Sequence, residues 1–582
     1  MRHEIINNKV IVRIRDRLCE SPEELVGSGL FRDIIILAIE QLEKSGSRLL
    51  AMFPAGDVDE NSITVLIRAI RELQHQPWEN AAKVADGAEI FFRDPELFND
   101  FVEYVYNFWR SFDRFIICDS TGDRLDRRPY RTFNTTVEFL TDLVRSVYRD
   151  VQENITGRHP NVYRQVNAGA EVSAIALPLD VPLPSGGYQK LKAIPVIRQA
   201  LLVPPLILNP PINTRSGVFE KTDINPADRV DLASDDWLCY PARVGDLLIL
   251  VYFYKEFFDL GLALCNLFEL ASIEELARKP DAVYFFGVPG DIGYSFGESP
   301  TVFHEDETNG MLVASVPCAD RFGYFGYLKK MVLTLHNICM MRRGRLPYHG
   351  AMVRILLKGG VDKTLLVIGD TGAGKSETLE AFRTVGDEYI RDMIVIADDM
   401  GSLEIDANGN VIGYGTEIGA FLRIDDLQPG YAFGQLDRSI IMSPNKTNAR
   451  IVLPVTTFAE VVRGTRVDLV LYANNYETID DDHPVVELFD APDDALRVFR
   501  EGTVMSKGTT SSTGIVHSYF ANIFGPPQYR DLHEELAQKY FGALFRAGAM
   551  VGQMRTRLGV HGWEMSGPQE AARALLALLS RR

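Results

Sequence analysis

Apolar residues recur at helical spacing through the first 155 residues. The stretches FRDIIILAIEQLEKSGSRLLAMF, SITVLIRAIRELQHQ and TVEFLTDLVRSVYRDV place apolar side chains three and four positions apart. This spacing predicts amphipathic helices. We therefore expect a helical N-terminal region over residues 1–155, and because no catalytic motif lies in it, we expect a scaffold or an oligomerisation domain.

From about residue 160 the pattern changes to short apolar runs that proline and glycine interrupt. The runs AEVSAIALPL and QALLVPPLIL predict strands, and strand and helix patterns mix over residues 245–345. Residues 349–520 hold further strand candidates, among them AMVRILL, TLLVIG, MIVIADD, ARIVLPV and VDLVLYAN. The C-terminal stretch returns to helical spacing. The pattern predicts an α/β protein with domains over residues 156–345 and 346–582 after the helical region.

Composition and charge narrow the range of partners and of cellular locations. The chain has 582 residues, is 46% hydrophobic and 24% charged, and carries a net charge of −18. A negative charge of this size argues against non-specific nucleic-acid binding, which needs a basic surface. Six scattered cysteines, no apolar signal core and no apolar run longer than LLILVYFY indicate a cytoplasmic protein outside the membrane.

A phosphate-binding pattern, G-x-x-x-x-G-K-[ST], occurs between a predicted strand and a predicted helix. TLLVIG precedes it and SETLEAFRTV follows it, which is the context that gives the pattern its meaning. Lys375 is expected to reach the terminal phosphates of a nucleotide, and Ser376 to bind Mg²⁺. The candidate nucleotide-binding residues are Gly369, Asp370, Thr371, Gly372, Ala373, Gly374, Lys375, Ser376 and Glu377.

Further candidate residues flank this loop on both sides. The run MIVIADD brings Asp398 and Asp399 to the end of a predicted strand, where carboxylates can bind a metal ion beside the phosphates. Upstream, apolar spacing predicts a helix that begins near Gly326 and carries Lys329 and Lys330 in its first turn. A lysine pair opposes the helix dipole there, so a nearby anion or metal ion would explain it.

The order of these residues resembles the phosphoenolpyruvate carboxykinases. In the ATP-type members a tyrosine lies six residues before a metal-binding lysine, and a metal-binding histidine follows nineteen residues later. Tyr324, Lys330 and His349 have the same separations, and the loop and Asp399 follow in the same order. The resemblance covers residues 205–582. It implies a two-lobed α/β fold, with a substrate-binding lobe at 156–345 and a P-loop lobe at 346–582.

The resemblance also implies an activity and a set of site residues. It implies decarboxylation of oxaloacetate and phosphoryl transfer to the enolate, giving phosphoenolpyruvate and CO₂. Mn²⁺ would be bound by Lys330, His349 and Asp399, and Mg²⁺ by Ser376 with Asp398. Further roles in contacting phosphate, nucleotide and substrate fall to Lys329, Tyr324, Lys375, Arg450 in TNARIVLPV, Lys507 in GTVMSKGTT and Arg215 in NTRSGVFEKTD. Arg158 is an alternative to Arg215.

Several alternatives remain open at the level of sequence. The loop ends in Lys-Ser-Glu, and with HGA and IADD it also resembles HPr kinase, which phosphorylates a protein serine. A kinase of a protein or small-molecule hydroxyl and a non-catalytic nucleotide-binding regulator are therefore the competing hypotheses. The donor is expected to be ATP, with GTP and pyrophosphate as alternatives, and the oligomeric state is not predicted.

Overall fold

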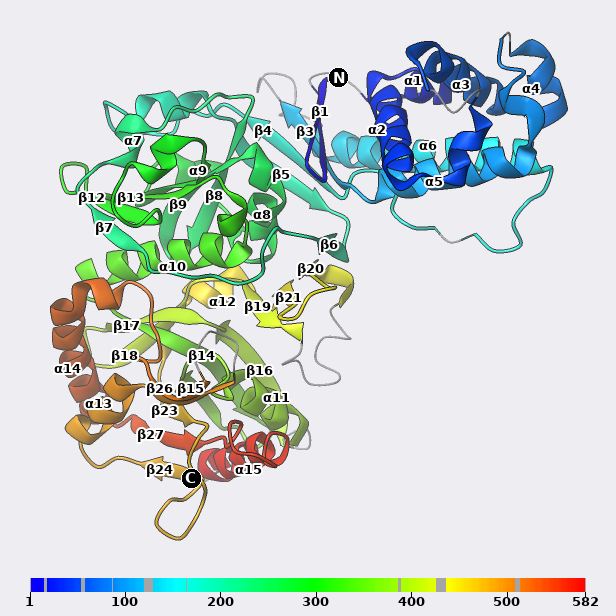
Figure 1. Ribbon diagram of the computed structural model, residues 1–582. Coiled ribbons are helices and arrows are strands. Elements are labelled where there is room, and N and C mark those ends of the chain that lie inside the picture. Colours follow the sequence, from blue (N-terminus) through cyan, green and yellow to red (C-terminus); the bar gives the residue numbers. More distant parts are fainter. Residues whose placement is uncertain are drawn as a thin grey trace. The chain divides into compact units, whose positions relative to one another are not determined.

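The computed structural model describes the chain from residue 2 to residue 580, with gaps. The gaps are residues 15–17, 54–57, 86, 120–128, 164, 386–388, 425–435 and 508–512. The protein has the expected α/β class, with several mixed sheets (Figure 1). It divides into two compact units, Met1–Pro178 with Ile197–Val203, and Leu179–Val196 with Pro204–Arg582. The expected domain boundaries at residues 155 and 345 do not coincide with this division.

Helices form a large part of the first unit, as the apolar spacing predicts. The helices are α1 (Pro22–Val26), α2 (Gly29–Ser45), α3 (Glu60–Leu73), α4 (Trp78–Val84), α5 (Pro95–Arg110) and α6 (Pro129–Thr156). Side-chain caps define the starts of the longer ones: Ser28 accepts the amide of Phe31 at 3.1 Å, and Asp59 accepts that of Ser62 at 2.7 Å.

The first unit also contains strands, which the expectation of a helical region over residues 1–155 does not include. The strands are β1 (Arg2–Ile6), β2 (Lys9–Ile14), β3 (Asp113–Asp119), β4 (Val172–Leu177) and β5 (Val196–Leu202), in the order β1-β2-β3-β4-β5. β1 pairs with β2 in antiparallel fashion, whereas β2–β3 and β3–β4 are parallel. Pairing of β4 with β3 places residues after 155 in this unit. Strands of five to seven residues are too short for their periodicity to be distinctive.

The first sheet of the second unit contains both parallel and antiparallel pairs. Its order is β8 (Trp237–Val244), β9 (Leu247–Tyr254), β11 (Ala282–Val288), β13 (Met311–Pro317), β12 (Val302–Asp306) and β7 (Glu220–Thr222), and β10 (Glu269–Leu270) pairs with β8. The helices of this part are α7 (Pro226–Arg229), α8 (Phe258–Ala263), α9 (Ile273–Leu276) and α10 (Phe325–Arg342). Helix α10 is buried along nearly its whole length.

A second sheet of this unit contains the phosphate-binding pattern. Its order is β22 (Thr465–Arg466), β18 (Val411–Gly415), β17 (Met400–Ile405), β14 (Leu346–Leu357), β15 (Asp362–Ile368), β23 (Leu469–Asn474), β27 (Met550–Arg555) and β24 (Val486–Leu488), and β16 (Ile390–Ala397) pairs with β14. The helices are α11 (Lys375–Val385), α12 (Phe458–Val462), α13 (Pro492–Glu501), α14 (Arg530–Arg546) and α15 (Ser566–Ser580). The predicted strand before the loop and the predicted helix after it are confirmed as β15 and α11.

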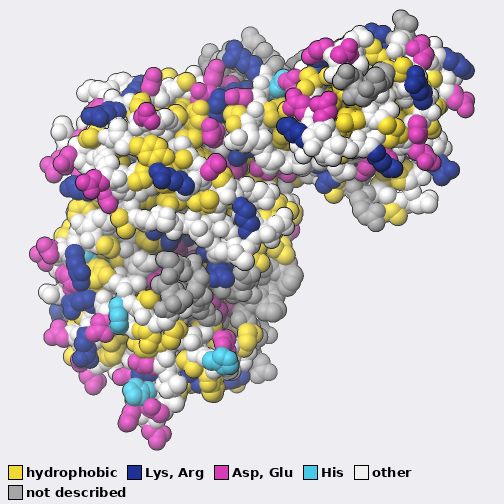
Figure 2. Space-filling model, viewed as in Figure 1, with side chains coloured by type: hydrophobic (Ala, Val, Ile, Leu, Met, Phe, Trp, Pro, Cys, Tyr) yellow, Lys and Arg dark blue, Asp and Glu magenta, His cyan; other side chains and the backbone are white. Residues whose placement is uncertain are grey.

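Two small sheets complete the second unit. One has the order β19 (Gly419–Arg423), β21 (Arg450–Pro454), β20 (Ile440–Met442) and β6 (Leu206–Leu208), and the other pairs β25 (Thr503–Lys507) with β26 (Thr513–His517). Within the described ranges, no helix combines the length and the apolar composition that crossing a lipid bilayer requires. On the face drawn in Figure 2, lysine and arginine side chains are interspersed with aspartate and glutamate.

Candidate active site

The phosphate-binding loop connects the end of β15 to the start of α11. Gly372 and Gly374 have φ angles of +77° and +92°, a region that side chains other than glycine rarely adopt. A Cβ atom on Gly374 would lie 2.6 Å from Thr556 Oγ1, and that hydroxyl donates a hydrogen bond to the carbonyl of Ala373 at 2.7 Å. Backbone conformation therefore requires glycine at positions 372 and 374, and the close approach of Thr556 requires it again at position 374.

Lys375 is the first residue of α11 and is buried, with 8% of its surface exposed. Its ammonium group donates to the carbonyls of Gly369 at 2.5 Å and of Asp370 at 3.1 Å. It thus lies over the loop that its own helix follows, at a helix N-terminus, where backbone amides and the helix dipole favour an anion. The neighbouring Ser376 is exposed.

Asp399 lies directly after β16 and connects two other predicted site residues. Its Oδ2 forms an ion pair with the ammonium nitrogen of Lys329 at 2.7 Å, and its Oδ1 lies 3.0 Å from Nε2 of His349. Burial by itself would raise the pKa of this carboxyl group, but Lys329 and His349 outweigh burial and hold the pKa well below its usual value. Asp399 is therefore a carboxylate at neutral pH.

The pKa of the adjacent Asp398 shifts in the opposite direction. Burial, and then the negative charge of Asp399, raise its pKa to about 6. The two neighbouring carboxyl groups thus differ strongly in proton affinity, because Lys329 and His349 contact Asp399 and do not contact Asp398. Separation of this kind is typical of sites in which two carboxyl groups have different roles.

Lys329 and Lys330 are adjacent on α10 but have different surroundings. Because α10 begins at Phe325, both lie just past the first turn and not inside it. Lys329 is 2% exposed and lies between Asp399 and Glu417, whose Oε1 is 3.2 Å from its ammonium group. Burial would lower the pKa of Lys329, but these carboxyl groups raise it above its usual value, so Lys329 is a fixed cation.

The ammonium group of Lys330 forms no hydrogen bond or ion pair with the described part of the chain. Its ammonium nitrogen lies 4.5 Å from the centre of the Phe524 ring. Burial, and then the positive charge of Arg215, lower its pKa to about 8, against the opposing charges of Asp399 and Asp370. A half-buried amine that loses its proton near neutral pH is available as a ligand for a metal ion.

His349 is a buried residue of β14 and uses both ring nitrogens. Nδ1 contacts the carbonyl oxygen of Ala521, and Nε2 faces Asp399 at 3.0 Å. When the Nδ1 hydrogen is donated to a carbonyl, the lone pair of Nε2 is presented on the side of Asp399, which is the usual arrangement behind a histidine that binds a metal ion. β14 begins at Leu346, before the predicted strand AMVRILL, and therefore includes His349.

Tyr324, Arg450 and Lys329 gather around the ring of Phe421. Arg450 lies 5.4 Å, Lys329 5.9 Å and Tyr324 6.0 Å from its centre. Burial raises the pKa of Tyr324 although the positive charges of Arg450, Lys329 and Arg215 act in the other direction. The structure therefore brings these four predicted residues into one electrostatic environment.

Arg215 and Arg450 each keep one guanidinium N–H without a partner. The Nε atoms of both are buried and have no hydrogen-bond partner among the residues that the structure describes. Arg215 Nη1 donates to the carbonyl of Gly217 at 2.7 Å, and its guanidinium stacks 4.9 Å from the Phe219 ring. Burying a charged donor without a partner is costly, so both side chains are suited to an anionic ligand.

The residues of the predicted set that remain outside this cluster are of two kinds. The backbone of Lys507 ends β25, but its side chain and Gly508 lie outside the described residues. Arg158 is an exposed residue of the first unit, whereas Arg215 belongs to the second unit with the rest of the site. Arg215 is therefore the better candidate for a substrate carboxylate.

Several residues of the site were not predicted. Glu417 is 1% exposed; neither carboxyl oxygen has a hydrogen bond of good geometry, and its contact is the ion pair with Lys329. Burial raises its pKa to about 8, with Lys329 acting against this shift. Asn475 donates to the carbonyls of Gly372 at 2.9 Å and of Met505 at 3.0 Å, and so connects the loop to β25. Asn475 directly follows the predicted strand VDLVLYAN, and this position at a strand end is the sequence signal that could have identified it.

The donors around Asp399 are of types that bind divalent transition-metal ions. One imidazole, one carboxylate and one amine that deprotonates readily form a mixed nitrogen and oxygen set. Among the described residues, no group of three or more His, Cys, Asp and Glu side chains is arranged to hold a metal ion, so the site depends on Lys330 as a third ligand. On the side of the loop, Ser376 and Asp398 provide the oxygen ligands that Mg²⁺ favours.

Glu417→Gln is expected to make stability less dependent on pH between about 4.5 and 8. Folded Glu417 keeps its proton up to a pKa of about 8, against 4.5 for an ordinary glutamate. The unfolded chain therefore binds fewer protons in this window, and stability falls as pH rises through it. Glutamine does not titrate. The free energy of unfolding of the variant relative to the natural protein should rise from pH 5 to pH 8, by at most about 1.4 kcal/mol per pH unit.

This expectation is checked by thermal unfolding of both proteins at pH 5, 6, 7 and 8 after treatment with a chelator. Glu404→Gln, a half-exposed glutamate on β17, is the matched control. A difference between Glu417→Gln and the natural protein that stays constant from pH 5 to pH 8 would show that Glu417 is ionised in the folded state.

Compared with protein-family models and with curated proteins, the chain matches none. Assignment of a function therefore depends on the geometry and the electrostatics of the site.

Proposed function

We propose that this protein is a phosphoenolpyruvate carboxykinase, which decarboxylates oxaloacetate and transfers a phosphoryl group to the resulting enolate. The observation that carries the proposal is the cluster around Asp399, where Lys329 and His349 converge on one carboxylate. Lys330, which follows Lys329 on α10, is an amine whose pKa of about 8 responds to the charge of Asp399. A nucleotide-binding module without catalytic activity has no need of this second group of residues beside the loop.

The anionic substrate has matching partners in the site. Oxaloacetate carries two carboxylates, and Arg215 and Arg450 hold buried N–H groups that lack partners among the described residues. In the proposal Arg215 pairs with a substrate carboxylate, and Arg450 with Lys329 stabilises negative charge on the transferring phosphoryl group. Tyr324 positions the substrate from the start of α10.

The two bond changes are assigned to two parts of the site. Cleavage of the bond between the carboxylate and the methylene group releases CO₂ and leaves its electron pair in an enolate. The enolate oxygen then forms a bond to the terminal phosphorus of the donor, and the bond from that phosphorus to the departing diphosphate breaks. Lys375 and the amides at the start of α11 hold the donor phosphates. A Mn²⁺ ion at Lys330, His349 and Asp399 would supply Lewis-acid stabilisation of negative charge on the substrate oxygen.

The two-lobed fold is part of the same proposal. It is supported by the two larger sheets of the second unit, one made of strands between residues 220 and 317 and the other of strands from residue 346 onward. α10 follows the first of these sheets and brings Lys329 to Asp399, at the end of a strand of the second.

The purified protein is expected to form phosphoenolpyruvate and CO₂ from oxaloacetate with Mn²⁺, Mg²⁺ and ATP. Phosphorus NMR identifies the product, with GTP and pyrophosphate tested as alternative donors and the reverse reaction followed with bicarbonate. If no donor yields phosphoenolpyruvate and labelled phosphate appears on a protein or alcohol acceptor, the protein is a kinase of the HPr kinase type. The sequence Lys-Ser-Glu at the end of the loop is what favours that second candidate.

A further inference from the structure

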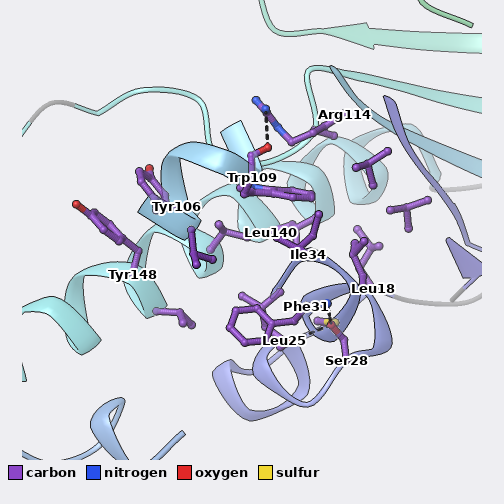
Figure 3. Close-up of a pocket in the computed structure, with 18 of the residues that line it drawn as sticks. Leu18, Leu25, Ser28, Phe31, Ile34, Tyr106, Trp109, Arg114, Leu140 and Tyr148 are labelled. Atoms are coloured by element: carbon purple, nitrogen blue, oxygen red, sulfur yellow. Dashed lines mark hydrogen bonds between the residues drawn. The ribbon is translucent and has the colours of Figure 1, made fainter. Parts of the chain in front are cut away.

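The first unit encloses an apolar cavity that no part of the proposed reaction uses. It has a volume of about 130 Å³ and is lined by residues of β2, β3, α2, α5 and α6, with further residues from the segments around Leu18 and Leu25. Figure 3 shows the side chains that surround it, among them Phe31 and Ile34 from α2, Trp109 from α5 and Leu140 from α6. The cavity thus lies where the helices cover the strands.

The polar groups that line the cavity are bonded within the protein. Arg114, the charged residue of the lining, is 3% exposed; it donates to the carbonyls of Gly169 at 2.7 Å and Phe112 at 2.6 Å and pairs with Glu171 at 3.0 Å. The indole N–H of Trp109 donates to Ala168 at 2.7 Å.

The remaining polar side chains of the lining also bond inside the unit or lie at its edge. Tyr148 donates its hydroxyl to Glu103, and its ring stacks on that of Tyr106 at 3.9 Å. In Figure 3 both tyrosine hydroxyls point away from the other residues drawn. Ser28 donates to Leu25 and caps α2. A ligand in this cavity therefore finds apolar surface and no free charged partner among the described residues.

The size and the chemistry of the cavity determine what it can hold. Protein interiors are normally close-packed, and side chains around an empty space lose dispersion contacts on that side. An apolar cavity of about 150 Å³ stays free of water and binds benzene. The present cavity is of similar size, and aromatic rings of Phe31, Trp109 and Tyr148 contribute to its wall.

We propose that the first unit binds a small neutral apolar molecule, of the size of one aromatic ring, in the cavity between β2–β3 and helices α2, α5 and α6. A charged ligand is disfavoured because Arg114 already has its partners and an unpaired carboxylate would lose its hydration. The lining residues of this cavity belong to the first unit, whereas the residues of the proposed active site belong to the second.

The test is ¹⁹F NMR of fluorobenzene with the full-length protein, with 4-fluorobenzoate as the charged probe of similar size. Fluorobenzene should show saturable binding, and 4-fluorobenzoate should not. At ten times its Kd, fluorobenzene should raise the Tm of the first unit by about 3–5 °C. Absence of saturable fluorobenzene binding, or equal binding of the benzoate, would overturn the proposal.

Two variants locate the binding within the cavity. Val144→Phe places a ring in the cavity and should remove fluorobenzene binding. Val84→Phe is the matched control, because Val84 is 54% exposed and lies on α4, outside the lining; it should bind as the natural protein does. Binding retained in a folded Val144→Phe variant would show that the probe lies elsewhere.

A third variant decides the matter if Val144→Phe does not fold. Ile34 is a buried lining residue, so Ile34→Ala enlarges the cavity. This variant should bind 1-fluoronaphthalene, which the natural protein should reject. If Ile34→Ala gains no affinity for the two-ring probe, the cavity is not the binding site and the proposal fails.

Discussion

Lys330→Ala is expected to lower kcat for phosphoenolpyruvate formation about 10²–10³-fold, the usual effect of removing one electrostatic contact to a transition state. The pKa of the Lys330 amine is lowered to about 8. Lys330 is therefore the residue of this site best able to become neutral and bind a metal ion. Affinity for the nucleotide should change much less, because Lys330 lies on α10, outside the phosphate-binding loop. Steady-state kinetics with Mn²⁺ and equilibrium binding of ATP measure the two effects separately.

Lys330→Arg separates a metal-binding amine from a positive charge. Arginine keeps its charge at every relevant pH and cannot supply a neutral nitrogen, so this variant should be nearly as inactive as Lys330→Ala. Lys279→Ala, an exposed lysine of the same unit, should behave as the natural protein. Normal turnover in Lys330→Arg would mean that the charge of Lys330 matters and that it does not bind the metal ion.

The phosphate-binding loop could be predicted from the sequence because its parts are contiguous. A strand, a glycine loop and a helix follow one another between residues 362 and 385, and each has a local signal. α10 could be predicted for the same reason, since apolar residues fill its length. The local pattern does not reveal that Lys375 is buried against the carbonyls of its own loop.

The cluster around Asp399 is a different case. His349 and Asp399 are 50 residues apart, and nothing in composition or spacing requires them to meet. The expectation that they meet came from resemblance, and pairing of β14 with β16 and β17 is the physical reason that they do. Glu417 had no signal, because a single acidic residue among the small and apolar residues after β18 is equally typical of an exposed turn.

The strands of the first unit could not be predicted from local sequence patterns. β2 and β3 pair in parallel although about a hundred residues separate them, so no hairpin turn connects these two strands. Helical spacing in the long stretches between them dominates the pattern. Parallel pairing across such a separation is a property of the folded chain that local periodicity does not contain.

Lys375→Ala is expected to lower phosphoryl transfer about 10³-fold or more while a slow decarboxylation of oxaloacetate to pyruvate continues. Lys375 lies at the N-terminus of α11 over the carbonyls of Gly369 and Asp370, so its loss removes the cation of the donor site. The cluster of Lys329, His349 and Asp399 does not include it. An enolate formed there without a phosphoryl donor takes up a proton and becomes pyruvate. Phosphorus NMR and a coupled pyruvate assay measure the two products.

Because Lys375 is buried, its removal also affects packing, and a second variant is needed to separate the two effects. Lys375→Met keeps the length of the side chain and loses the charge, so it should lose phosphoryl transfer as fully as Lys375→Ala at a smaller cost in Tm. Lys363→Ala, on the preceding strand β15, is the control for a lysine outside the loop. If Lys375→Met formed phosphoenolpyruvate at the natural rate, this loop would not hold the phosphoryl donor. If both variants lost pyruvate formation as well, while their Tm stayed unchanged, decarboxylation would require an occupied donor site, and the division of the two bond changes between two parts of the site would be wrong.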